Sequence, residues 1–315
     1  MLTSDQNRKI NEIVEEFKEA ADFYRMEYSE DLMGMFRDFG CMLLLKCKVD
    51  TEGKADLERL LEGRHKLKGT VKRQLMTVSE ELVQLWAPGE QDGSGDTGEY
   101  EGSQNVREMF QTALEEIFHF CLYSKGGKNR YLLPEETAKP LLRLLTFPEG
   151  MMAGNEGLVV LDTQCGAGSA LMAASRYLKN LRLMGYEKDE EMWAAAVIMS
   201  QLSGLEMELH LEDGARADLY ESCDLVISNP VYGTDTIKDE ELIDQLPGEL
   251  KTVRGRYHME LIRSMQALNF DGKAMLIVPN SFLFANRTES MKVRKWLLQS
   301  YSLEAIISLP EDTFM

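Results

Sequence analysis

The first part of the chain has the hydrophobic pattern of helices. Its apolar residues recur at intervals of three and four positions, a period that places them on one face of a helix. Ser4 and Asp5, which are residue types that cap helices, precede the first stretch. Further helical stretches are predicted from about Ala55 to Leu85 and from about Val106 to Tyr123. The first stretch carries the apolar stripe Ile10, Ile13, Val14, Phe17, Ala20 and Ala21.

The segment 87–105 has no such pattern. It reads APGEQDGSGDTGEYEGSQN, rich in glycine and serine, with several acidic residues and no basic one. This composition is typical of flexible linkers. We therefore expect a helical N-terminal domain at 1–128 that contains a flexible acidic linker near 87–105.

After Pro148 the pattern changes to short apolar runs separated by helix-like segments. Strands that alternate with helices predict a mostly parallel α/β sheet, and this second domain is placed at 129–315. The predicted strands are Leu158–Leu161, Leu183–Tyr186, Met207–Leu211, Leu225–Ser228, Ala274–Val278 and Leu303–Leu309.

Composition narrows the class of protein. The run Gly40–Leu45 is far shorter than the roughly 20 apolar residues of a membrane span, and no signal-peptide pattern precedes it, so a cytoplasmic location without a membrane partner is expected. Five cysteines without a Cys-x-x-Cys pair and four scattered histidines predict neither disulfides nor a metal site. The net charge of −18 predicts that the chain alone binds nucleic acid poorly.

A glycine-containing loop follows the first predicted strand. Asp162 ends that strand, Gly166 and Gly168 come next, and a helix is expected to begin near Ser169. The glycines allow positive φ and close approach of a ligand, and a helix N-terminus favours an anionic group. A dinucleotide fingerprint would have a third glycine where Leu171 stands. The Asp-x-x-x-Gly-x-Gly form instead resembles motif I of class I S-adenosylmethionine-dependent methyltransferases.

Two acidic residues follow later strands in register with this loop. Glu187 ends the second predicted strand, where a carboxylate can accept hydrogen bonds from both ribose hydroxyls. The resemblance implies that Asp162 helps to hold the amino group of the cofactor and that Asp213 lies against its adenine amine. Asp213-Gly214 is equally typical of a turn.

The fourth predicted strand runs into Asn229-Pro230-Val231-Tyr232. This tetrad resembles motif IV of amino-methyltransferases, which is usually Asn-Pro-Pro followed by an aromatic residue. An exocyclic amine is a poor nucleophile until hydrogen-bond acceptors rehybridise it, and the Asn229 side chain and the Pro230 carbonyl could be those acceptors. Tyr232 would stack on a base that is rotated out of the duplex. Val231 replaces the second proline and relaxes the backbone there.

Together these motifs resemble the modification subunit of type I restriction systems and related N6-adenine DNA methyltransferases, over about Asn129 to Met315. The resemblance implies S-adenosylmethionine as cofactor, DNA as substrate and a separate specificity subunit as partner. Tyr131 and Pro134 occupy the position of the element that covers the cofactor in that family, with Leu133 in place of its threonine.

The resemblance also bears on the end of the chain and its basic residues. The family's sheet finishes with an antiparallel strand that would follow Met315, so we expect a truncated chain or another way of completing the sheet. Basic residues near the tetrad and beyond it are interpreted singly as solvated charges: Arg254, Arg256, His258, Arg287, Lys292, Arg294 and Lys295.

Other interpretations stay open on the sequence alone. The substrate could be an RNA base or a glutamine side-chain amide, because relatives with similar tetrads methylate these groups. Val231, Leu133 and the absent last strand are also compatible with a catalytically degenerate scaffold. Incorporation of methyl groups into DNA, RNA and protein distinguishes these hypotheses.

Overall fold

The computed structural model forms two compact units, which are described separately below. The first comprises Met1–Lys128 with Val197–Leu205, and the second comprises Asn129–Ala196 with Glu206–Met315. The structure describes residues 2–28, 32–47, 49, 55–63, 67, 69–86, 101–124, 132–145, 157–220, 222–230 and 236–310.

The described part of 1–128 is helical, as predicted. The apolar stripe of the first helix is buried from Ile10 to Ala21. The predicted stretch from Ala55 to Leu85 is two helices, because Gly69 adopts φ = 61°, a left-handed conformation that a continuous helix does not accommodate. The helices are α1 (Ser4–Glu27), α2 (Leu32–Lys46), α3 (Ala55–Gly63), α4 (Gly69–Leu85) and α5 (Glu101–Tyr123).

Two predicted boundaries in this unit were wrong. The cap of α1 is Thr3, not Ser4 or Asp5: its hydroxyl accepts the Gln6 N–H at 3.3 Å while the Gln6 side chain accepts the Thr3 N–H at 2.7 Å. This reciprocal pairing satisfies two N–H groups that would otherwise lack partners. At the other boundary, α5 begins at Glu101, so the last five positions of the predicted linker are helical; residues 87–100 lie outside the described residues.

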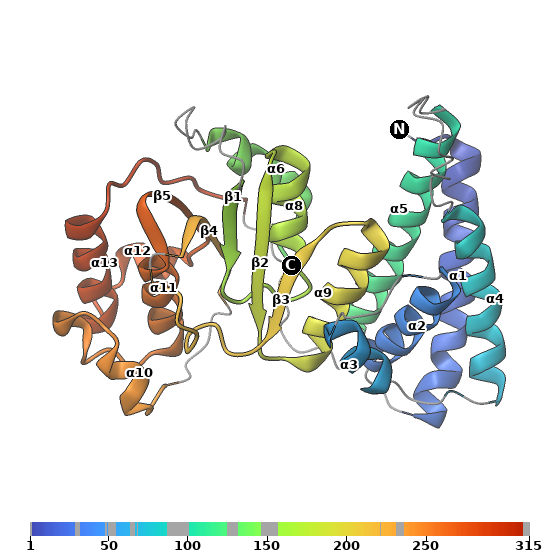
Figure 1. Ribbon diagram of the computed structural model, residues 1–315, viewed down its shortest axis with the longest axis horizontal. Coiled ribbons are helices and arrows are strands. Elements are labelled where there is room, and N and C mark those ends of the chain that lie inside the picture. The colour runs from blue at the N-terminus through green and yellow to red at the C-terminus, as the bar shows by residue number, and fades with distance from the viewer. Residues whose placement is uncertain are drawn as a thin grey trace. The chain divides into compact units, whose positions relative to one another are not determined.

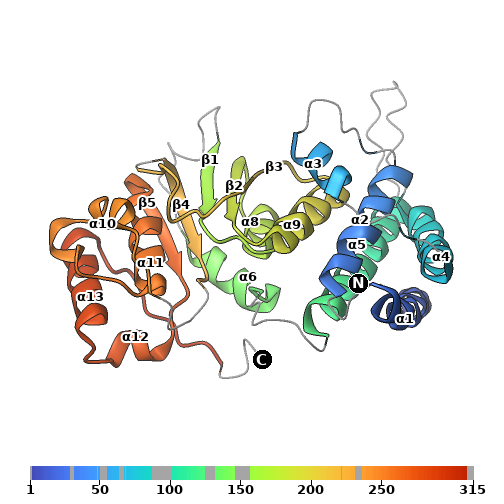
Figure 2. The same ribbon diagram turned by 90° about the horizontal axis from the view of Figure 1, so that it is seen from below.

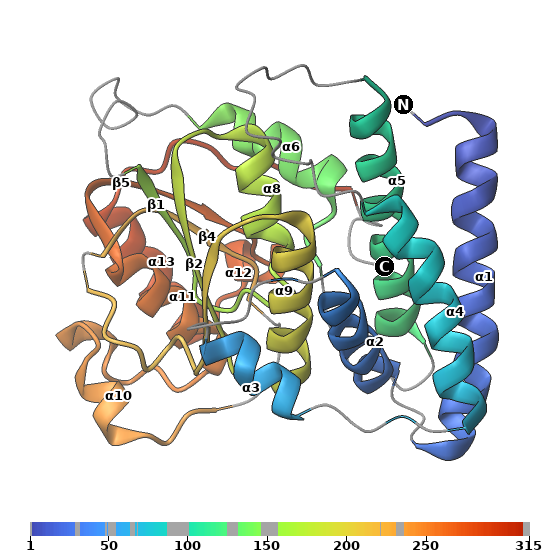
Figure 3. The ribbon, with the colours of Figure 1, turned by 45° about the vertical axis from the view of Figure 1, so that its right-hand side comes forward.

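Helix α2 is the most extensively buried helix of the helical unit. It contacts α1, α4 and α5, which run beside one another (Figure 3), and its buried side chains lie on every face. Phe39 of α2 packs edge-on against Phe17 of α1, and Phe36 packs against Phe118 of α5, with ring centroids 5.0 Å apart in both pairs. A helix that is apolar all round requires burial on all sides, which explains this position.

The second unit contains one parallel sheet of five strands in the order β3-β2-β1-β4-β5 (Figure 1). β4 carries Leu225, Val226 and Ile227, all fully buried, as expected for a strand covered on both faces. The strands are β1 (Leu158–Asp162), β2 (Leu181–Glu187), β3 (Met207–Leu211), β4 (Cys223–Ser228) and β5 (Leu268–Leu276).

Helices cover both faces of this sheet, as Figure 2 shows. α6 packs on α8, which contacts β1 and β2, whereas α11 contacts β4, β5 and α13. The helical elements of the unit are α6 (Glu135–Leu144), α8 (Ser169–Tyr177), the first half of α9 (Glu190–Ser203), α10 (Glu240–Asp244), η1 (Gly248–Leu250), α11 (Arg256–Gln266), α12 (Asn280–Phe284) and α13 (Thr288–Ser300). From Val197 onward, α9 belongs to the first unit.

The strand order reverses between β1 and β4. β1 leads to β2 on one side, while β4 lies on its other side, with Val160 paired to Leu225 and Leu161 to Val226. In open α/β sheets, ligands bind beyond the carboxyl ends of the strands at such a reversal. The loops after Asp162 and Ser228 therefore flank the expected binding position.

The predicted strand Leu303–Leu309 was wrong. No strand is formed there, and Leu303, Ile306 and Ile307 are 61%, 65% and 47% exposed. A strand is maintained by hydrogen bonds to a neighbour, and the five described strands do not include one paired with this segment. An apolar run alone therefore did not determine strand pairing.

Candidate functional site at the switch point of the sheet

The glycine loop adopts the predicted strand-turn-helix form. β1 ends at Asp162 and α8 begins at Ser169. Gly166 and Gly168 have φ values of 55° and 81°, in the region that favours glycine. The Cys165 N–H donates to the Tyr186 carbonyl at 2.9 Å, which joins the loop to β2. The two glycines thus allow the backbone turn, and the hydrogen bond anchors the loop to the neighbouring strand.

Asp162 is a buried carboxyl with few partners. It is 2% exposed, and its Oδ1 accepts the Gln164 N–H at 3.0 Å. Burial raises its pKa to about 7, an effect opposed by the Gln164 N–H and reinforced by the Glu187 carboxylate. Among the described residues it forms no ion pair. A cationic group brought beside it would stabilise its ionised form.

Glu187 connects the ends of two loops. One carboxylate oxygen accepts the Gly166 N–H at 3.0 Å, and the other accepts the Asp189 N–H at 2.7 Å. Burial raises its pKa, and these two N–H groups oppose the rise. Each carboxylate oxygen has a second lone pair, so the group can still accept hydrogen bonds from a ligand.

Two further polar side chains at this edge lack partners. Neither the amide oxygen nor the amide nitrogen of Gln164 has a hydrogen-bond partner in the described part of the chain, although both atoms are buried. The same holds for the hydroxyl of Ser228, which is 1% exposed at the end of β4. An unsatisfied buried polar group costs about 1–3 kcal/mol. Such groups are expected where a polar ligand supplies the missing partner.

The tetrad begins directly after β4. Asn229 and Pro230 follow Ser228, whose carbonyl accepts the Ile277 N–H at 2.8 Å and so fixes the strand end. Val231 and Tyr232 lie outside the described residues. The structure therefore locates the two predicted acceptors at the switch point, and the stacking role of Tyr232 stays a prediction.

The element upstream of α6 contacts the glycine loop. The Leu133 N–H donates to the hydroxyl of Ser169, the first residue of α8, at 3.2 Å, and Pro134 precedes α6 as its cap residue. The backbone of Leu133 makes this contact, so the contact does not depend on the side chain that replaces the family's threonine. Tyr131 lies outside the described residues.

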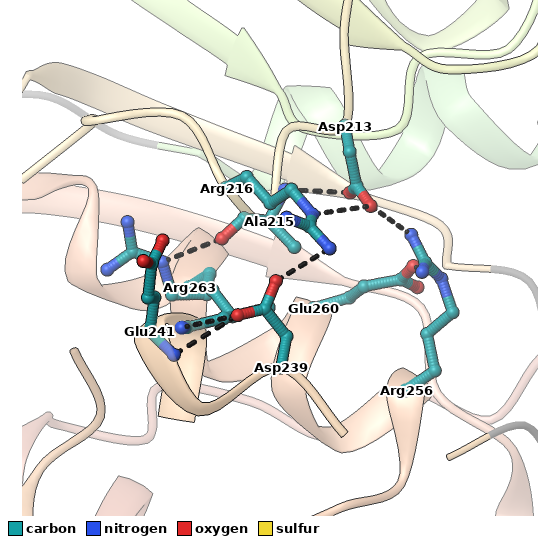
Figure 4. A network of polar contacts seen from close by, with 9 residues as sticks. Asp213, Ala215, Arg216, Asp239, Glu241, Arg256, Glu260 and Arg263 are labelled. Atoms are coloured by element: carbon teal, nitrogen blue, oxygen red, sulfur yellow. Dashed lines mark hydrogen bonds and ion pairs between the residues drawn. The ribbon is translucent and has the colours of Figure 1, made fainter. Parts of the chain in front are cut away.

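Asp213 follows β3 in a tight turn. A Cβ at Gly214 would overlap the Thr163 carbonyl, so glycine allows the loops after β1 and β3 to touch. Asp213 Oδ1 accepts the Ala215 N–H at 3.2 Å, and Oδ2 pairs with Arg256 at 2.7 Å (Figure 4). A hollow of about 250 Å³ adjoins it, whose charged lining residues are Asp213, Arg216, Lys238, Asp239 and Arg256.

The sequence interpretation of Arg256 as a solvated charge was wrong. Its side chain is 23% exposed and contacts Asp213 and Glu260. The signal was present in the helical spacing of Arg256, Glu260 and Ser264, which places three polar residues on one face of a helix that also packs on the sheet. Gln164 was also missed, because a glutamine in a loop carries no distinctive pattern.

Comparison with known proteins agrees with this arrangement. The family model for N-6 DNA methylases matches residues 107–315, about two thirds of the chain, and includes most of α5. The chain belongs to the N-6 DNA methylase family. Because the match begins inside α5, the family's characteristic region extends from the helical unit through the sheet.

Two curated relatives match parts of the chain. It is 25% identical over 284 residues to the type I restriction enzyme MjaVII methylase subunit of Methanocaldococcus jannaschii, covering 82% of this chain and 44% of that protein. It is 27% identical over 179 residues to the type II restriction enzyme and methyltransferase RM.BcgI of Heyndrickxia coagulans, covering 51% and 26%. The chain thus spans less than half the length of each relative.

Two solved structures show the fold. A Listeria monocytogenes protein assigned to the class I S-adenosylmethionine-dependent methyltransferases has a TM-score of 0.65, 18% identity and coverage of 98% of this chain and 84% of that one. The type I restriction-modification methyltransferase subunit of Streptococcus thermophilus has a TM-score of 0.55, 16% identity and coverage of 92% and 79%. The predicted class I methyltransferase fold, preceded by helices, is confirmed.

The family implies S-adenosylmethionine as cofactor, and the residues present fit it. The cofactor carries an ammonium group, for which Asp162 offers a buried carboxyl without an ion-pair partner in the described chain. Its ribose hydroxyls require acceptors, and Glu187 places a carboxylate with further lone pairs at the end of β2. The positive-φ glycines leave room for close approach between these two acids.

The described residues contain no cluster of three or more His, Cys, Asp or Glu side chains that could hold a metal ion. In the same residues, no helix is both long and apolar enough to cross a membrane. The five cysteines are all buried, and none of them forms a disulfide.

Cofactor affinity should depend on pH through Asp162. Because its pKa is raised to about 7 in the free protein, the carboxyl is protonated at lower pH and cannot pair with an ammonium group. Calorimetric titration with S-adenosylhomocysteine should therefore show affinity falling roughly 10- to 30-fold from about pH 7.5 to about pH 5.5. An Asp162→Asn variant should bind S-adenosylhomocysteine weakly, and its affinity should change little with pH. Equal wild-type affinity across the range would contradict the assignment.

Proposed function

We propose that this chain transfers a methyl group from S-adenosylmethionine to the N6 amino group of adenine in DNA, as a type I modification subunit does. The observation that carries the proposal is the convergence of the glycine loop and Asn229-Pro230 at the reversal of strand order. Leu161 and Val226 are paired neighbours in the sheet, so the loops that follow them begin side by side.

The chain would hold the cofactor at several points. Asp162 would pair with the ammonium group, Glu187 would accept hydrogen bonds from the ribose, and Asp213 from the adenine amine. Tyr131 and Pro134 would cover the cofactor from the segment before α6. When bound, the cofactor supplies a methyl group activated by a positively charged sulfur.

Catalysis would consist largely of positioning. The Asn229 side-chain oxygen and the Pro230 carbonyl would accept hydrogen bonds from the target amine and so increase the electron density on its nitrogen. Tyr232 would stack on the extruded base. A strong general base is unnecessary in this proposal, because the sulfonium is already a good leaving group and the amine loses its proton late.

Recognition of DNA would depend on a partner. A net charge of −18 opposes binding to phosphates, so we propose that a separate specificity subunit supplies base recognition and much of the binding. The curated relative from Methanocaldococcus jannaschii is a methylase subunit by name, which supports this organisation. We also propose that 1–128 and 129–315 are separate domains and that the protein acts in the cytoplasm.

The test is methyl incorporation from labelled S-adenosylmethionine into three substrates: unmethylated DNA, RNA and protein. Each reaction is run with and without the specificity subunit of the same system, and the modified product is identified by mass spectrometry. We expect N6-methyladenine in DNA, increased by the partner. Label in RNA or in glutamine would reassign the substrate, and cofactor binding without any incorporation would support the scaffold interpretation.

A further inference from the structure

Helix α11 has a buried polar face. Arg256, Glu260, Arg263 and Ser264 occupy positions i, i+4, i+7 and i+8, which lie on one side of a helix. Glu260, Arg263 and Ser264 are 3%, 7% and 0% exposed. Charged residues are rarely buried to this degree unless they are paired. Their contacts therefore indicate what this face of the helix does.

The C-terminal part of this face binds the loops that follow β1 and β3. The Arg263 guanidinium donates to the Ala215 carbonyl at 3.0 Å and to the Ala217 carbonyl at 2.8 Å. The hydroxyls of Ser264 and Thr163 lie 2.6 Å apart. These contacts fix the backbone that follows Asp213 to α11, independently of the Asp213 side chain.

The first turn of α11 fixes the Asp213 side chain. Arg256 Nη2 lies 2.7 Å from Asp213 Oδ2, and Arg256 Nε lies 2.6 Å from Glu260 Oε1 (Figure 4). Burial raises the pKa of Glu260 to about 7, and Arg256 opposes this rise. Desolvating such a group offsets most of the attraction, so a buried ion pair contributes little net stability and is better explained by the orientation it imposes.

We propose that Arg256 is a positioning residue that holds the Asp213 carboxylate in the orientation that recognises the 6-amino group of the cofactor's adenine. This inference rests on the proposed cofactor site. Oδ2 lies 2.7 Å from Arg256 and 4.0 Å from Arg216 Nε, which also pairs with Asp239, and Oδ1 accepts the Ala215 N–H, so the carboxylate is held at both oxygens with Arg256 as its nearer cation. The remaining lone pair of Oδ1 has one direction in which to accept a hydrogen bond.

The experiment compares two ligands that differ only in the amine: S-adenosylhomocysteine and its 6-deamino purine analogue. A hydrogen bond to a charged group contributes enough for the wild type to prefer the amine about 10- to 100-fold. In Arg256→Gln we expect this preference to fall to about threefold or less, with affinity for the deamino analogue nearly unchanged. A merely structural role would weaken both ligands together and leave their ratio intact.

Two further variants complete the design. Arg256→Gln leaves Glu260 buried without its partner, so the double variant Arg256→Gln/Glu260→Gln removes both charges and should show the same loss of preference if the single variant unfolds. Arg254→Gln is the matched control, because Arg254 donates to the Lys251 and Val253 carbonyls and should keep the wild-type preference.

The outcomes separate this proposal from the proposed function. If both Arg256 variants keep the wild-type preference for S-adenosylhomocysteine over the deamino analogue, the positioning role is overturned and the proposed cofactor site is unaffected. Equal wild-type affinity for the two ligands would show that Asp213 does not recognise the amine, which also overturns it. If the wild type binds neither ligand, the cofactor site itself fails and the positioning role with it.

Discussion

Asn229→Ala should abolish most methyl transfer without affecting cofactor binding. The side-chain oxygen that follows β4 is a proposed acceptor for the target amine, and its contribution arises as that nitrogen attacks the methyl group. Removing one positioned hydrogen-bonding group of this kind lowers kcat by about 100- to 1,000-fold. Single-turnover methylation of DNA with the specificity subunit measures the loss, and calorimetry with S-adenosylhomocysteine should give a Kd within about threefold of the wild type.

The control and the conservative variant sharpen this test. Asn286→Ala makes the same change at an exposed position after α12 and should leave the rate unaltered. Asn229→Asp keeps an acceptor oxygen and should retain more activity than alanine. If Asn229→Ala methylates DNA at the wild-type rate, the tetrad is only a turn, and the acceptor must be sought elsewhere at this edge of the sheet.

The strands that carry the site were predictable because their signals are local. Residues 158–168 combine an apolar strand, an acid and two glycines, and the backbone angles of Gly166 and Gly168 are those that the pattern requires. Glu187 ends its strand as predicted. In each case the chemistry depends on residues close in sequence, or on the rule that parallel strands present their carboxyl ends together.

The remainder depends on contacts between distant segments. Arg256 is 43 positions from Asp213, and nothing in the local sequence of either indicates that the two charges meet. Leu303–Leu309 shows the opposite error: its composition is strand-like, but a strand also needs a neighbour with unpaired backbone groups. Local patterns thus identified the cofactor loop and carried a signal for the polar face of α11, whereas the pairing of Arg256 with Asp213 required the fold.

Glu187→Gln should weaken cofactor binding about 30- to 100-fold. The carboxylate already accepts two backbone N–H groups, from Gly166 and Asp189, and would accept the ribose hydroxyls with its remaining lone pairs. A glutamine amide keeps the shape of the side chain but has one acceptor oxygen. Losing one charge-assisted hydrogen bond costs about 1.5–3 kcal/mol, and each 1.4 kcal/mol is about tenfold in affinity. Calorimetric titration with S-adenosylhomocysteine measures the change.

The same substitution should also destabilise the glycine loop. This effect on stability can be measured without ligand, separately from the effect on cofactor affinity. The amide nitrogen would face the N–H of either Gly166 or Asp189, so the ligand-free protein should melt at a lower temperature. Adding the same saturating concentration of S-adenosylhomocysteine to both proteins should widen this difference, because binding stabilises by RT ln(1 + [L]/Kd) and the larger Kd of the variant gives it less stabilisation. Glu190→Gln, an exposed change in the first turn of α9, should alter neither quantity. A Glu187→Gln variant with wild-type affinity but a lowered melting temperature would mean that Glu187 shapes the loop and that another group binds the ribose.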